Sequence, residues 1–460
     1  MATPLLQLHV AMYPWFAMGH ISPFLHLANK LARRGHRISF FLPKRTKAKL
    51  EHLNLHPHLI TLFPIPIPQV DGLPSDAETT ADVPFSLITH LMTAMDRTEK
   101  DIELLLLHLK PNVVLFDLTC WMPSLTRRLG IKSVQYIITS LTSAAYLESM
   151  EKLCQENNLD ADELVHPPVG FPDSSFKLQA HEVRFLASFI KLELGSGVRL
   201  HDRISTGNRF SDAVGFKGCR ELEGQYADYL ETLFGKPFLL SGPVLPEPNT
   251  STLDEKWAEW LAGFKPGSVI YCAFGSEWRI NHDQFKELLL GLELTGFPFL
   301  AALKAPIGFE SVEAALPEGF KERVQERGIV HGGWVQQTLI LEHPSIGCFI
   351  SHCGSGSLIE ALVNKCQIVA LSNNYADQIL IAKMLSSSLK VGVEVEKGEE
   401  DGLFTKESVC KAVKTVMDDE SAVGREVRAN HLQLRNLLLS KDLENTYIDS
   451  FVQKLQELLG

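Results

Sequence analysis

Short apolar segments alternate with amphipathic helical patterns along this chain of 460 residues, and this alternation limits the possible folds more than any other feature. The apolar run at 5–13 is followed by a loop and a helical pattern in which Phe24, Leu27 and Leu31 share one face. Another apolar segment follows at 37–43. A strand, a loop, a helix and a strand in this order build parallel sheets. We therefore expect an α/β fold.

The pattern stops and restarts once. Residues 241–256 are rich in Pro, Ser, Thr and charged side chains, a composition typical of a linker. Before this segment, strands are also expected at 111–117, 132–138 and 212–217, with helical patterns between them that include 85–109. After it, strands are expected at 268–276, 297–303, 328–333, 346–352, 367–372 and 390–396, and helices at 282–294, 357–364 and 377–387. The sequence thus predicts two doubly wound parallel sheets.

Charge and cysteine usage exclude several classes of protein. The net charge is −11, and no long basic run is present to follow a phosphate backbone, so nucleic acid is not an expected partner. The eight cysteines are scattered without a CxxC pair, which indicates neither a disulfide framework nor a zinc knuckle. The N-terminus lacks the features of a secretory signal, and charges or prolines interrupt every apolar stretch. We expect a cytoplasmic protein that does not insert into a membrane.

The segment 351–357, Ser-His-Cys-Gly-Ser-Gly-Ser, lies between an expected strand and an expected helix. Small residues expose backbone N–H groups, and a helix N-terminus carries a partial positive charge, so this turn suits a phosphate group. His352 adds a side-chain donor. The alternative is a tight structural turn, and the segment matches neither GxGxxG nor a Walker-type loop.

The surrounding residues 334–378 resemble the signature of plant UDP-dependent glycosyltransferases. The resemblance extends over the whole chain, and AMYPWFAMGHISP, WVQQ and VGVEVEKGEEDGLFTKESV are similar to the branch that extends the sugar of flavonoid or anthocyanin glycosides. The signature is carried by Trp334, Gln337, His343, Pro344, Gly347, Ser351, His352, Cys353, Gly354, Ser357, Glu360, Asp377 and Gln378.

The resemblance implies a GT-B fold, in which two Rossmann-like domains face a cleft. Residues 1–240 would form the acceptor-binding domain, 241–256 the linker and 257–440 the UDP-sugar-binding domain. Residues 441–460 would form a C-terminal helix that crosses back to the first domain. The acceptor pocket would be built from loops around 13–20, 84–95, 118–145 and 179–200, which do not identify the acceptor. We expect a monomer.

The resemblance also implies the residues that bind the donor. Trp334 would stack on uracil and Glu360 would accept the ribose hydroxyls, whereas a buried core Trp and a Glu facing a helix dipole are the alternatives. Asp377 and Gln378 would contact the donor sugar, or else form a helix cap and first turn. Ser276 would bind phosphate or simply cap a helix. The full implied set is Ser276, Trp334, Val335, Gln337, His352, Gly354, Ser355, Gly356, Ser357, Glu360, Asp377 and Gln378.

Transfer of a sugar to an alcohol needs a base, and neutral imidazole suits cytosolic pH. His20 follows the first strand and matches the histidine of the family's MGHISP segment. Asp117 follows the strand 111–117, where its carboxylate could hold the imidazole; the alternative is a helix N-cap near Trp121. The implied reaction is a single inverting displacement without a metal cofactor, with the UDP-sugar as co-substrate.

Some features leave alternatives open. Asp160 and Asp162 form a DxD pattern like the Mn²⁺ sites of other sugar transferases, but they lie in a polar stretch away from any strand end, so we interpret them as surface residues. Ser355, Gly356 and Ala376 depart from the family's usual residues, and 370–378 is one residue longer. Glucose is the expected donor, with xylose, arabinose, galactose and rhamnose open. Transfer to an aglycone or terpenoid, a UDP-sugar epimerase and an inactive UDP-sugar-binding protein are the alternative functions.

Overall fold

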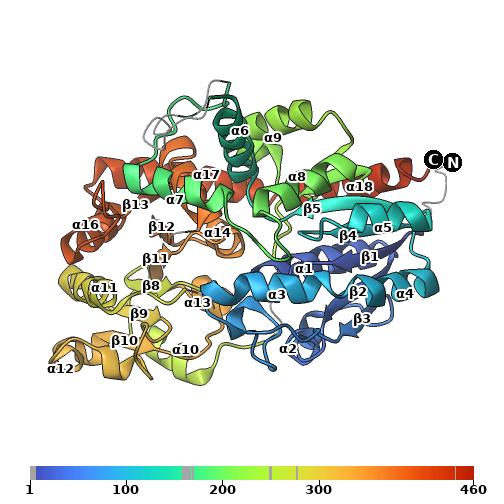
Figure 1. Ribbon diagram of the computed structural model, residues 1–460. Helices are drawn as coiled ribbons and strands as arrows, with labels where there is room; N and C mark the ends of the chain where they lie inside the picture. The colour runs from blue at the N-terminus through green and yellow to red at the C-terminus, as the bar shows by residue number, and fades with distance from the viewer. Residues whose placement is uncertain are drawn as a thin grey trace. The chain divides into compact units, whose positions relative to one another are not determined.

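The computed structural model describes residues 7–157, 167, 170–247, 251–275, 278–373, 375–440 and 442–460, and they form two compact units (Figure 1). Unit 1 comprises residues 1–147, 187–245 and 441–460, and unit 2 comprises 148–186 and 246–440. The boundary between the units at 245 and 246 lies within the segment 241–256 that is expected to be a linker. The described residues of the segment 148–186, which the sequence pattern assigns to the first domain, group with unit 2.

Unit 1 is built on a parallel sheet of seven strands in the order β3-β2-β1-β4-β5-β6-β7. The expected strand at 37–43 is observed with those bounds, whereas β3 and β7 were not expected. From β1 the chain adds β2 and β3 on one side of the sheet, and from β4 it adds β5, β6 and β7 on the other. The direction in which strands are added therefore reverses between β1 and β4. The strands are β1 (His9–Tyr13), β2 (Arg37–Pro43), β3 (Ile60–Ile65), β4 (Val113–Phe116), β5 (Lys132–Ile137), β6 (Ala213–Phe216) and β7 (Phe238–Leu240).

Helices cover both faces of this sheet. Val10 and Met12 of β1 pack in one hydrophobic cluster with α1, whereas Ala11 and Tyr13 belong to a second cluster with α3, α4 and α5. This division follows from the alternation of side chains along a strand. The helices are α1 (Met18–Arg33), α2 (Thr46–Leu50), α3 (Ile88–Asp96), α4 (Glu99–Leu109), α5 (Met122–Leu129), α8 (Leu200–Phe210) and α9 (Arg220–Phe234), while α6 (Leu141–Asn157) and α7 (Ala180–Ile190) begin in one unit and end in the other.

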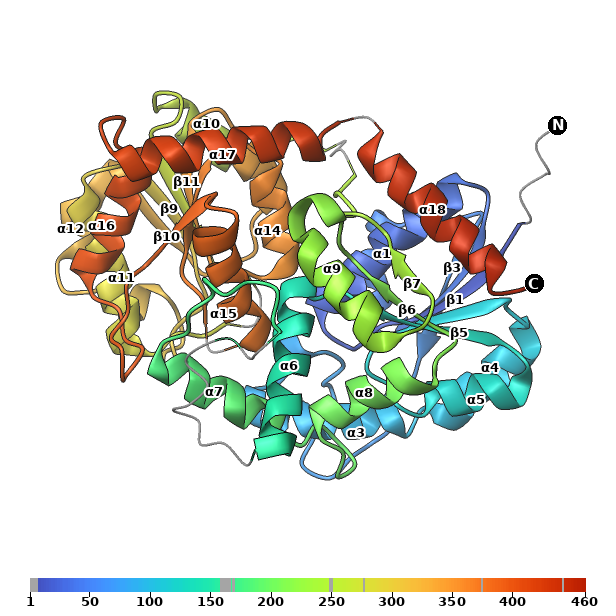
Figure 2. The same cartoon turned by 90° about the horizontal axis from the view of Figure 1, so that it is seen from above.

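The C-terminal helix α18 (Leu443–Glu457) is part of the core of unit 1 and lies beside α1 (Figure 2). Its buried residues Ile448, Phe451 and Leu455 recur at helical spacing and pack in the same cluster as α1. Lys30 Nζ of α1 forms an ion pair with Glu444 Oε2 at 2.9 Å. The end of the chain therefore stabilises the sheet that its beginning forms.

Unit 2 repeats the strand order on a parallel sheet of six strands, β10-β9-β8-β11-β12-β13. The expected strands of this half are all observed, with slightly shorter bounds. The strands are β8 (Val269–Ala273), β9 (Phe299–Ala302), β10 (Gly328–His331), β11 (Ile346–Ser351), β12 (Gln367–Ala370) and β13 (Gly392–Glu394); the helices are α10 (Glu255–Ala262), α11 (His282–Thr295), α12 (Phe320–Val324), α13 (Gln337–Glu342), α14 (Ser355–Leu362), α15 (Ala376–Lys383), α16 (Lys406–Met417) and α17 (Ala422–Leu438).

Polar contacts explain why the segment 148–186 clusters with unit 2. Glu182, at the start of α7, is 1% exposed, and its Oε1 lies 3.1 Å from Lys383 Nζ. Lys383 also pairs with Glu394 at 2.9 Å. Asp173 Oδ2 accepts a hydrogen bond from Ser388 Oγ at 2.5 Å. A buried lysine between two carboxylates is a strong local constraint, because removal of one partner would leave a buried charge unpaired.

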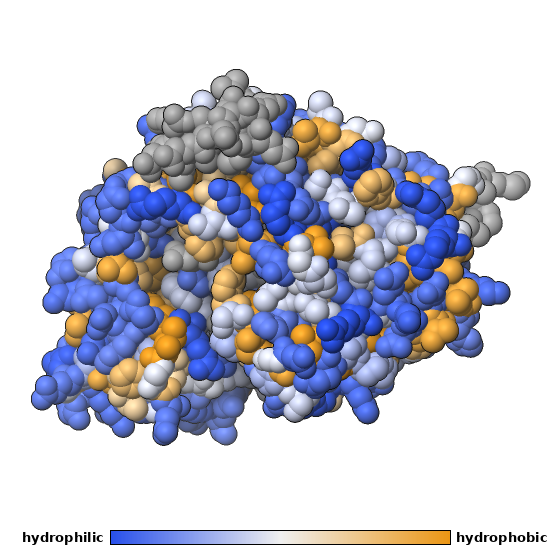
Figure 3. Space-filling view, viewed as in Figure 1, coloured by the Kyte–Doolittle hydropathy of each residue, from blue (hydrophilic) through white to orange (hydrophobic). Residues whose placement is uncertain are grey.

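The surface shows no concentration of apolar side chains on the face in Figure 3, where hydrophobic groups occur in small patches among polar ones. In the part of the chain that the structure describes, no helix is long and apolar enough to cross a membrane.

Candidate active site

The predicted catalytic pair lies where the strand order of unit 1 reverses. His20 is in the first turn of α1, which follows β1, and Asp117 comes directly after β4. Because these strands are parallel neighbours, their carboxyl ends meet. His20 Nδ1–H donates a hydrogen bond to Asp117 Oδ2. The structure therefore brings together two residues that are 97 positions apart in the sequence.

Asp117 is fixed from two further sides. Its Oδ2 also accepts the backbone N–H of Trp15 at 3.3 Å, and its carbonyl oxygen accepts Gln135 Nε2 at 3.1 Å. The Asp117 side chain is 4% exposed, whereas the His20 side chain is 22% exposed. A carboxylate only accepts, so Nδ1 carries the hydrogen and Nε2 of a neutral ring is left with a lone pair. This arrangement can accept a proton at Nε2.

The alternative role of Asp117 as a helix cap does not fit the geometry. Helix α5 begins at Met122 with Trp121 as its N-cap, and no side chain caps it. The carboxylate instead bonds to groups that precede α1 or lie in its first turn. The geometry thus removes the helix-cap alternative for Asp117. Its role beside the catalytic base stays a prediction.

In unit 2 the turn between β11 and α14 exposes backbone donors. Cys353 is buried with a φ of 67°, and its N–H donates to Ser351 Oγ at 3.1 Å. Helix α14 begins at Ser355 after Gly354, and no side-chain cap bonds to its first turn. The first N–H groups of a helix have no partner within the helix. The N-terminus of α14 is therefore formed by the predicted phosphate-binding residues Gly354, Ser355, Gly356 and Ser357. Backbone N–H groups at such a terminus favour the binding of an anion.

Glycines on both sides leave room for the His352 ring in this turn. A Cβ on Gly354 would lie 2.6 Å from His352 Nε2, and a Cβ on Gly275 would lie 3.2 Å from the same atom. Burial lowers the pKa of His352 to about 4, so the ring is neutral at pH 7. Among the described residues, no hydrogen-bond partner is found for its buried Nδ1. The ring also bonds to the Ala273 backbone, and a neutral imidazole carries a single N–H, so Nδ1 can donate to an oxygen of a ligand only in the tautomer that carries the hydrogen at Nδ1.

Three of the predicted nucleotide-binding residues form one hydrogen-bonded group. Gln337 Nε2 donates to Glu360 Oε2 at 2.6 Å and to Ser357 Oγ at 3.1 Å. Tyr271 OH donates to Gln337 Oε1 at 3.3 Å, which fixes the orientation of the amide. Glu360 is thus held at the first turns of α14 by side chains from α13 and β8. This group positions a carboxylate for a pair of hydroxyl groups.

Trp334 is 82% exposed, the largest value among the large hydrophobic side chains that the structure describes. Its alternative role as a core residue is therefore wrong. The next residue, Val335, is 8% exposed and anchors the segment. An exposed indole beside buried apolar structure is typical of a stacking surface.

The predicted sugar-contacting residues begin α15. Ala376 is buried at 1% exposure, Asp377 lies in the first turn, and the buried Gln378 Oε1 has no hydrogen-bond partner among the described residues. Tyr375, and not Asp377, is the N-cap of this helix. The loop before it is fixed by Lys397, whose Nζ donates to Ser372 O at 2.7 Å and Ser372 Oγ at 3.1 Å.

Comparison with known proteins identifies the family. The sequence profile of the family described as UDP-glucoronosyl and UDP-glucosyl transferase matches residues 323–434. The chain is 60% identical over 452 residues to cyanidin 3-O-galactoside 2''-O-xylosyltransferase of Actinidia chinensis var. chinensis, covering 98% of this chain and 99% of that protein. It is 57% identical to anthocyanidin 3-O-glucoside 2''-O-glucosyltransferase of Ipomoea nil, covering 98% of each. The chain belongs to this family of UDP-glycosyltransferases.

The fold of the glycosyltransferase agrees with solved structures. The enzyme UGT73P12 of Glycyrrhiza uralensis, solved with glycyrrhetinic acid 3-O-monoglucuronide, superimposes with a TM-score of 0.82 at 21% identity, covering 98% of this chain and 96% of that one. The two parallel sheets and this likeness confirm the predicted GT-B fold. The resemblance drawn from residues 334–378 and the assignment as an enzyme that uses a UDP-sugar are also confirmed.

Several features of the glycosyltransferase were missed or lie outside the structure. Tyr271 and Gln135 orient site residues, and Lys397 supports the loop before α15. In the sequence these three residues resemble ordinary strand or surface residues. Their roles are visible only from contacts with residues far away in the sequence. Ser276, Asp160 and Asp162 lie outside the described residues. Within the described residues, no group of three or more His, Cys, Asp or Glu side chains lies close enough to hold a metal ion.

Proposed function

We propose that this glycosyltransferase adds a sugar to a hydroxyl of the sugar on a flavonoid or anthocyanidin glycoside, and most specifically to the 2''-hydroxyl of a 3-O-glycoside. One observation carries the proposal: two relatives at 57–60% identity over 98% of the chain are both named for transfer to that oxygen. Their names differ in the donor sugar and in the first sugar of the acceptor. The position of the new bond is what they share.

Glucose is the donor sugar that we propose, and xylose is the alternative. The Ipomoea nil relative is named a glucosyltransferase and the Actinidia relative a xylosyltransferase. The two sugars differ in the hydroxymethyl group at carbon 5, so the choice depends on groups near that position. Asp377 and Gln378 are the side chains proposed to contact the donor sugar.

The proposed chemistry is a single displacement with inversion at the anomeric carbon. The acceptor oxygen attacks C1 of the donor sugar while its proton passes to Nε2 of His20. Asp117 holds the ring through Nδ1–H and stabilises the positive charge that develops on it. UDP leaves from the opposite face. The hydrogen bond of His20 to a carboxylate that is 4% exposed supports these roles.

Unit 2 is proposed to bind UDP-sugar, and unit 1 to bind the acceptor. Trp334 would stack on uracil, and Glu360, oriented by Gln337, would accept both ribose hydroxyls. The N-terminus of α14 and His352 would donate to the diphosphate, with Ser276 as a further predicted donor. Hydrogen-bond donors aimed at the leaving oxygens stabilise the developing charge. We propose that these groups serve in place of a bound metal ion.

The test is a panel of acceptors and donors with purified enzyme. The acceptors are cyanidin or quercetin, the matching 3-O- and 7-O-glucosides and a terpenoid alcohol; the donors are UDP-glucose, UDP-xylose, UDP-galactose, UDP-arabinose and UDP-rhamnose. We expect the largest kcat/KM with a 3-O-glucoside and UDP-glucose, and linkage NMR should place the new bond at the 2''-oxygen.

Other outcomes would change the proposal in defined ways. Preference for a free aglycone by more than tenfold in kcat/KM would overturn the acceptor class. Conversion of the donor without an acceptor would indicate an epimerase, and binding of UDP without any turnover would indicate an inactive protein. Light scattering of the purified enzyme tests the proposed monomer, and a fluorescent fusion in plant cells tests the proposed cytoplasmic location.

A further inference from the structure

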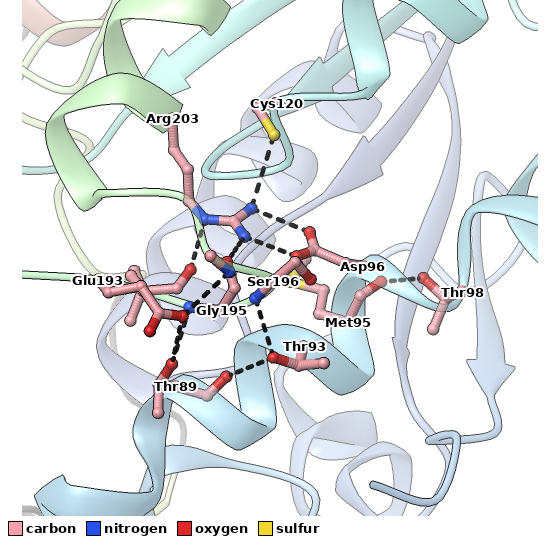
Figure 4. A network of polar contacts seen from close by, with 12 residues as sticks. Thr89, Thr93, Met95, Asp96, Thr98, Cys120, Glu193, Gly195, Ser196 and Arg203 are labelled. Carbon is pink, nitrogen blue, oxygen red and sulfur yellow. Dashed lines mark hydrogen bonds and ion pairs between the residues drawn. The ribbon is translucent and has the colours of Figure 1, made fainter.

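A buried arginine in unit 1 contacts two of the four loops that are expected to form the acceptor pocket, 118–145 and 179–200. It also pairs with Asp96, which directly follows the loop 84–95, and connects through that segment to the loop 13–20. Arg203 lies on α8 and is 0% exposed (Figure 4). Its guanidinium forms a two-pronged ion pair with Asp96 at the end of α3, at 2.9 and 2.6 Å. A buried charge is costly unless it is paired and fully hydrogen-bonded.

Every N–H of this guanidinium has an acceptor. Besides Asp96, Nε donates to Leu194 O, Nη2 donates to Gly195 O at 2.6 Å, and Nη1 lies 3.7 Å from Cys120 Sγ. Arginine offers five N–H donors in a planar fork, whereas lysine offers three from a single point. The site is therefore specific for arginine by its geometry.

Close packing and hydrogen bonds hold the turn at 193–199 against α3. Gly195 has a φ of 81°, and a Cβ there would lie 2.7 Å from Met92 Cγ. Gly195 N–H donates to Thr89 Oγ1 at 2.9 Å, and Ser196 N–H donates to Thr93 Oγ1 at 3.1 Å. Ser196 Oγ donates to Asp96 Oδ2 at 2.6 Å, so the carboxylate binds the turn as well as Arg203. Figure 4 shows these bonds converging on one turn and one helix face.

The network continues toward the predicted catalytic pair on two sides. Cys120 lies three residues after Asp117 in the loop between β4 and α5. On the other side, Thr98 Oγ1 donates to Met95 O at 2.6 Å and accepts Tyr13 OH at 2.7 Å. Tyr13 ends β1, two residues before Trp15, whose N–H bonds to Asp117. Both loops that carry the catalytic pair are thus connected to the segment that pairs with Arg203.

We propose that Arg203, together with Asp96, is a positioning residue for the acceptor. It holds the loops around 13–20, 84–95, 118–145 and 179–200 in one arrangement and does not itself touch the substrate. The residues proposed to bind the donor belong to unit 2, whereas all residues of this network belong to unit 1. Loss of the network should therefore weaken acceptor binding and leave donor binding unchanged. The inference deepens the proposed function and depends on it only in that unit 1 binds the acceptor.

The test compares Arg203→Lys with a matched control, Arg34→Lys. Arg34 is another many-bonded arginine of unit 1, but its partners are Lys30 O, Asn445 and Asp449, which include two residues of α18 and none of the acceptor loops. Steady-state kinetics of each variant would give KM for acceptor and for UDP-sugar, with the acceptor that the wild-type enzyme uses best. A failure of the 2''-position proposal would then leave this comparison intact.

We expect Arg203→Lys to raise the acceptor KM roughly tenfold and to change the donor KM less than about twofold. Arg34→Lys should change both less than about twofold even if its thermal midpoint falls by the same amount. An acceptor KM that stays within about twofold of wild type, or an equal rise in both KM values, would overturn the inference.

A milder variant keeps the inference testable if Arg203→Lys does not fold. Ser196→Gly suits the φ of 56° at this position and removes only the hydrogen bond to Asp96. It should raise the acceptor KM about threefold in the same direction, without a change in donor KM. Hydrogen exchange should rise in peptides that cover 88–98 and 192–199 and stay unchanged in 334–360. An unchanged acceptor KM in this variant, with faster exchange, would assign the network to stability alone.

Discussion

The two sheets of the molecule share one topology and use its reversal point differently. In unit 1 the order reverses between β1 and β4, and in unit 2 between β8 and β11. A histidine follows a strand at each reversal. His20 bonds to the carboxylate of Asp117, whereas His352 lies between Gly275 and Gly354, and no ion pair with a carboxylate is found for it among the described residues. Ligands collect at this position in open parallel sheets, so topology alone predicts two sites and not their chemistry.

The partner of each imidazole determines what it can do. A neighbouring carboxylate stabilises a protonated ring, which suits a residue that accepts a proton during the reaction. Burial keeps the ring of His352 neutral, and a neutral ring can donate one hydrogen bond. We therefore expect changes at the first histidine to affect the rate and changes in the second sheet to affect donor binding and stability.

The largest effect is expected from His20→Ala. Loss of a general base typically lowers the rate by about 10²- to 10⁴-fold, and the nucleotide is proposed to bind in the other unit. Steady-state rates should fall by that factor while calorimetric affinity for UDP stays within about twofold. If His20→Ala keeps more than about a tenth of the wild-type activity, His20 is not the general base, and the two histidines do not differ in the way we propose.

Asp117→Asn should reduce kcat by about 10²-fold and leave the fold intact, because the amide occupies the same space. The amide cannot stabilise a charged imidazole, so the pH profile of kcat/KM should differ from that of wild type. Asp117→Ala is the control that also removes the contact to Trp15 N–H. A pH profile identical to that of wild type would mean that the carboxylate only orders the loop.

The sequence predicted the central strands of both sheets and the edge strands of unit 2, but missed the two edge strands of unit 1. Central strands such as β4 and β11 are continuous apolar runs, which a fully buried parallel strand requires. The missed strands β3 and β7 are both edges of unit 1; β3 contains Pro64, and β7 has three residues. Proline in a strand is tolerated at an edge, where one ladder hydrogen bond fewer is needed. Local pattern carries less information there.

The candidate site shows the same limit. The roles of His20, Asp117 and His352 were predicted from their places after central strands together with the resemblance to the family's segments, and they stay predictions. The role of Arg203 could not be predicted in this way, because it depends on bonds to segments more than 80 residues away, including Asp96 and Cys120. The packing of 148–186 on unit 2 likewise depends on ion pairs such as Glu182 with Lys383, which no local pattern indicates.

Donor binding in unit 2 should weaken when either of two residues is replaced: Glu360, which is hydrogen-bonded to Gln337, or the exposed Trp334. Glu360→Ala should raise the KM for UDP-sugar about tenfold or more with little change in saturated turnover, since hydrogen bonds to a charged group contribute about 1.5–3 kcal/mol. Trp334→Ala should act similarly, because base stacking contributes about 1–3 kcal/mol. Trp334 is 82% exposed, so its loss should not lower the thermal midpoint. A normal KM together with a lower midpoint would place the nucleotide elsewhere.

The smallest effect concerns the pH dependence of stability at His352. The pKa of this ring is about 4 in the folded protein, against an ordinary value of 6.5. Between these values the unfolded chain binds a proton that the folded chain does not, so stability is full above pH 6.5 and falls as the pH drops toward 4. The loss should be on the order of 1–3 kcal/mol, or a few degrees in the thermal midpoint. His352→Gln cannot titrate, so its midpoint should fall less than that of wild type between pH 7 and 4.

Saturating UDP should reduce the stability that the wild-type protein loses at low pH, because a bound diphosphate favours the protonated ring of His352. If the thermal midpoints of wild type and His352→Gln change equally with pH, the His352 ring is already solvated in the folded protein. The two histidines would then differ only in that His20 has Asp117 as a partner.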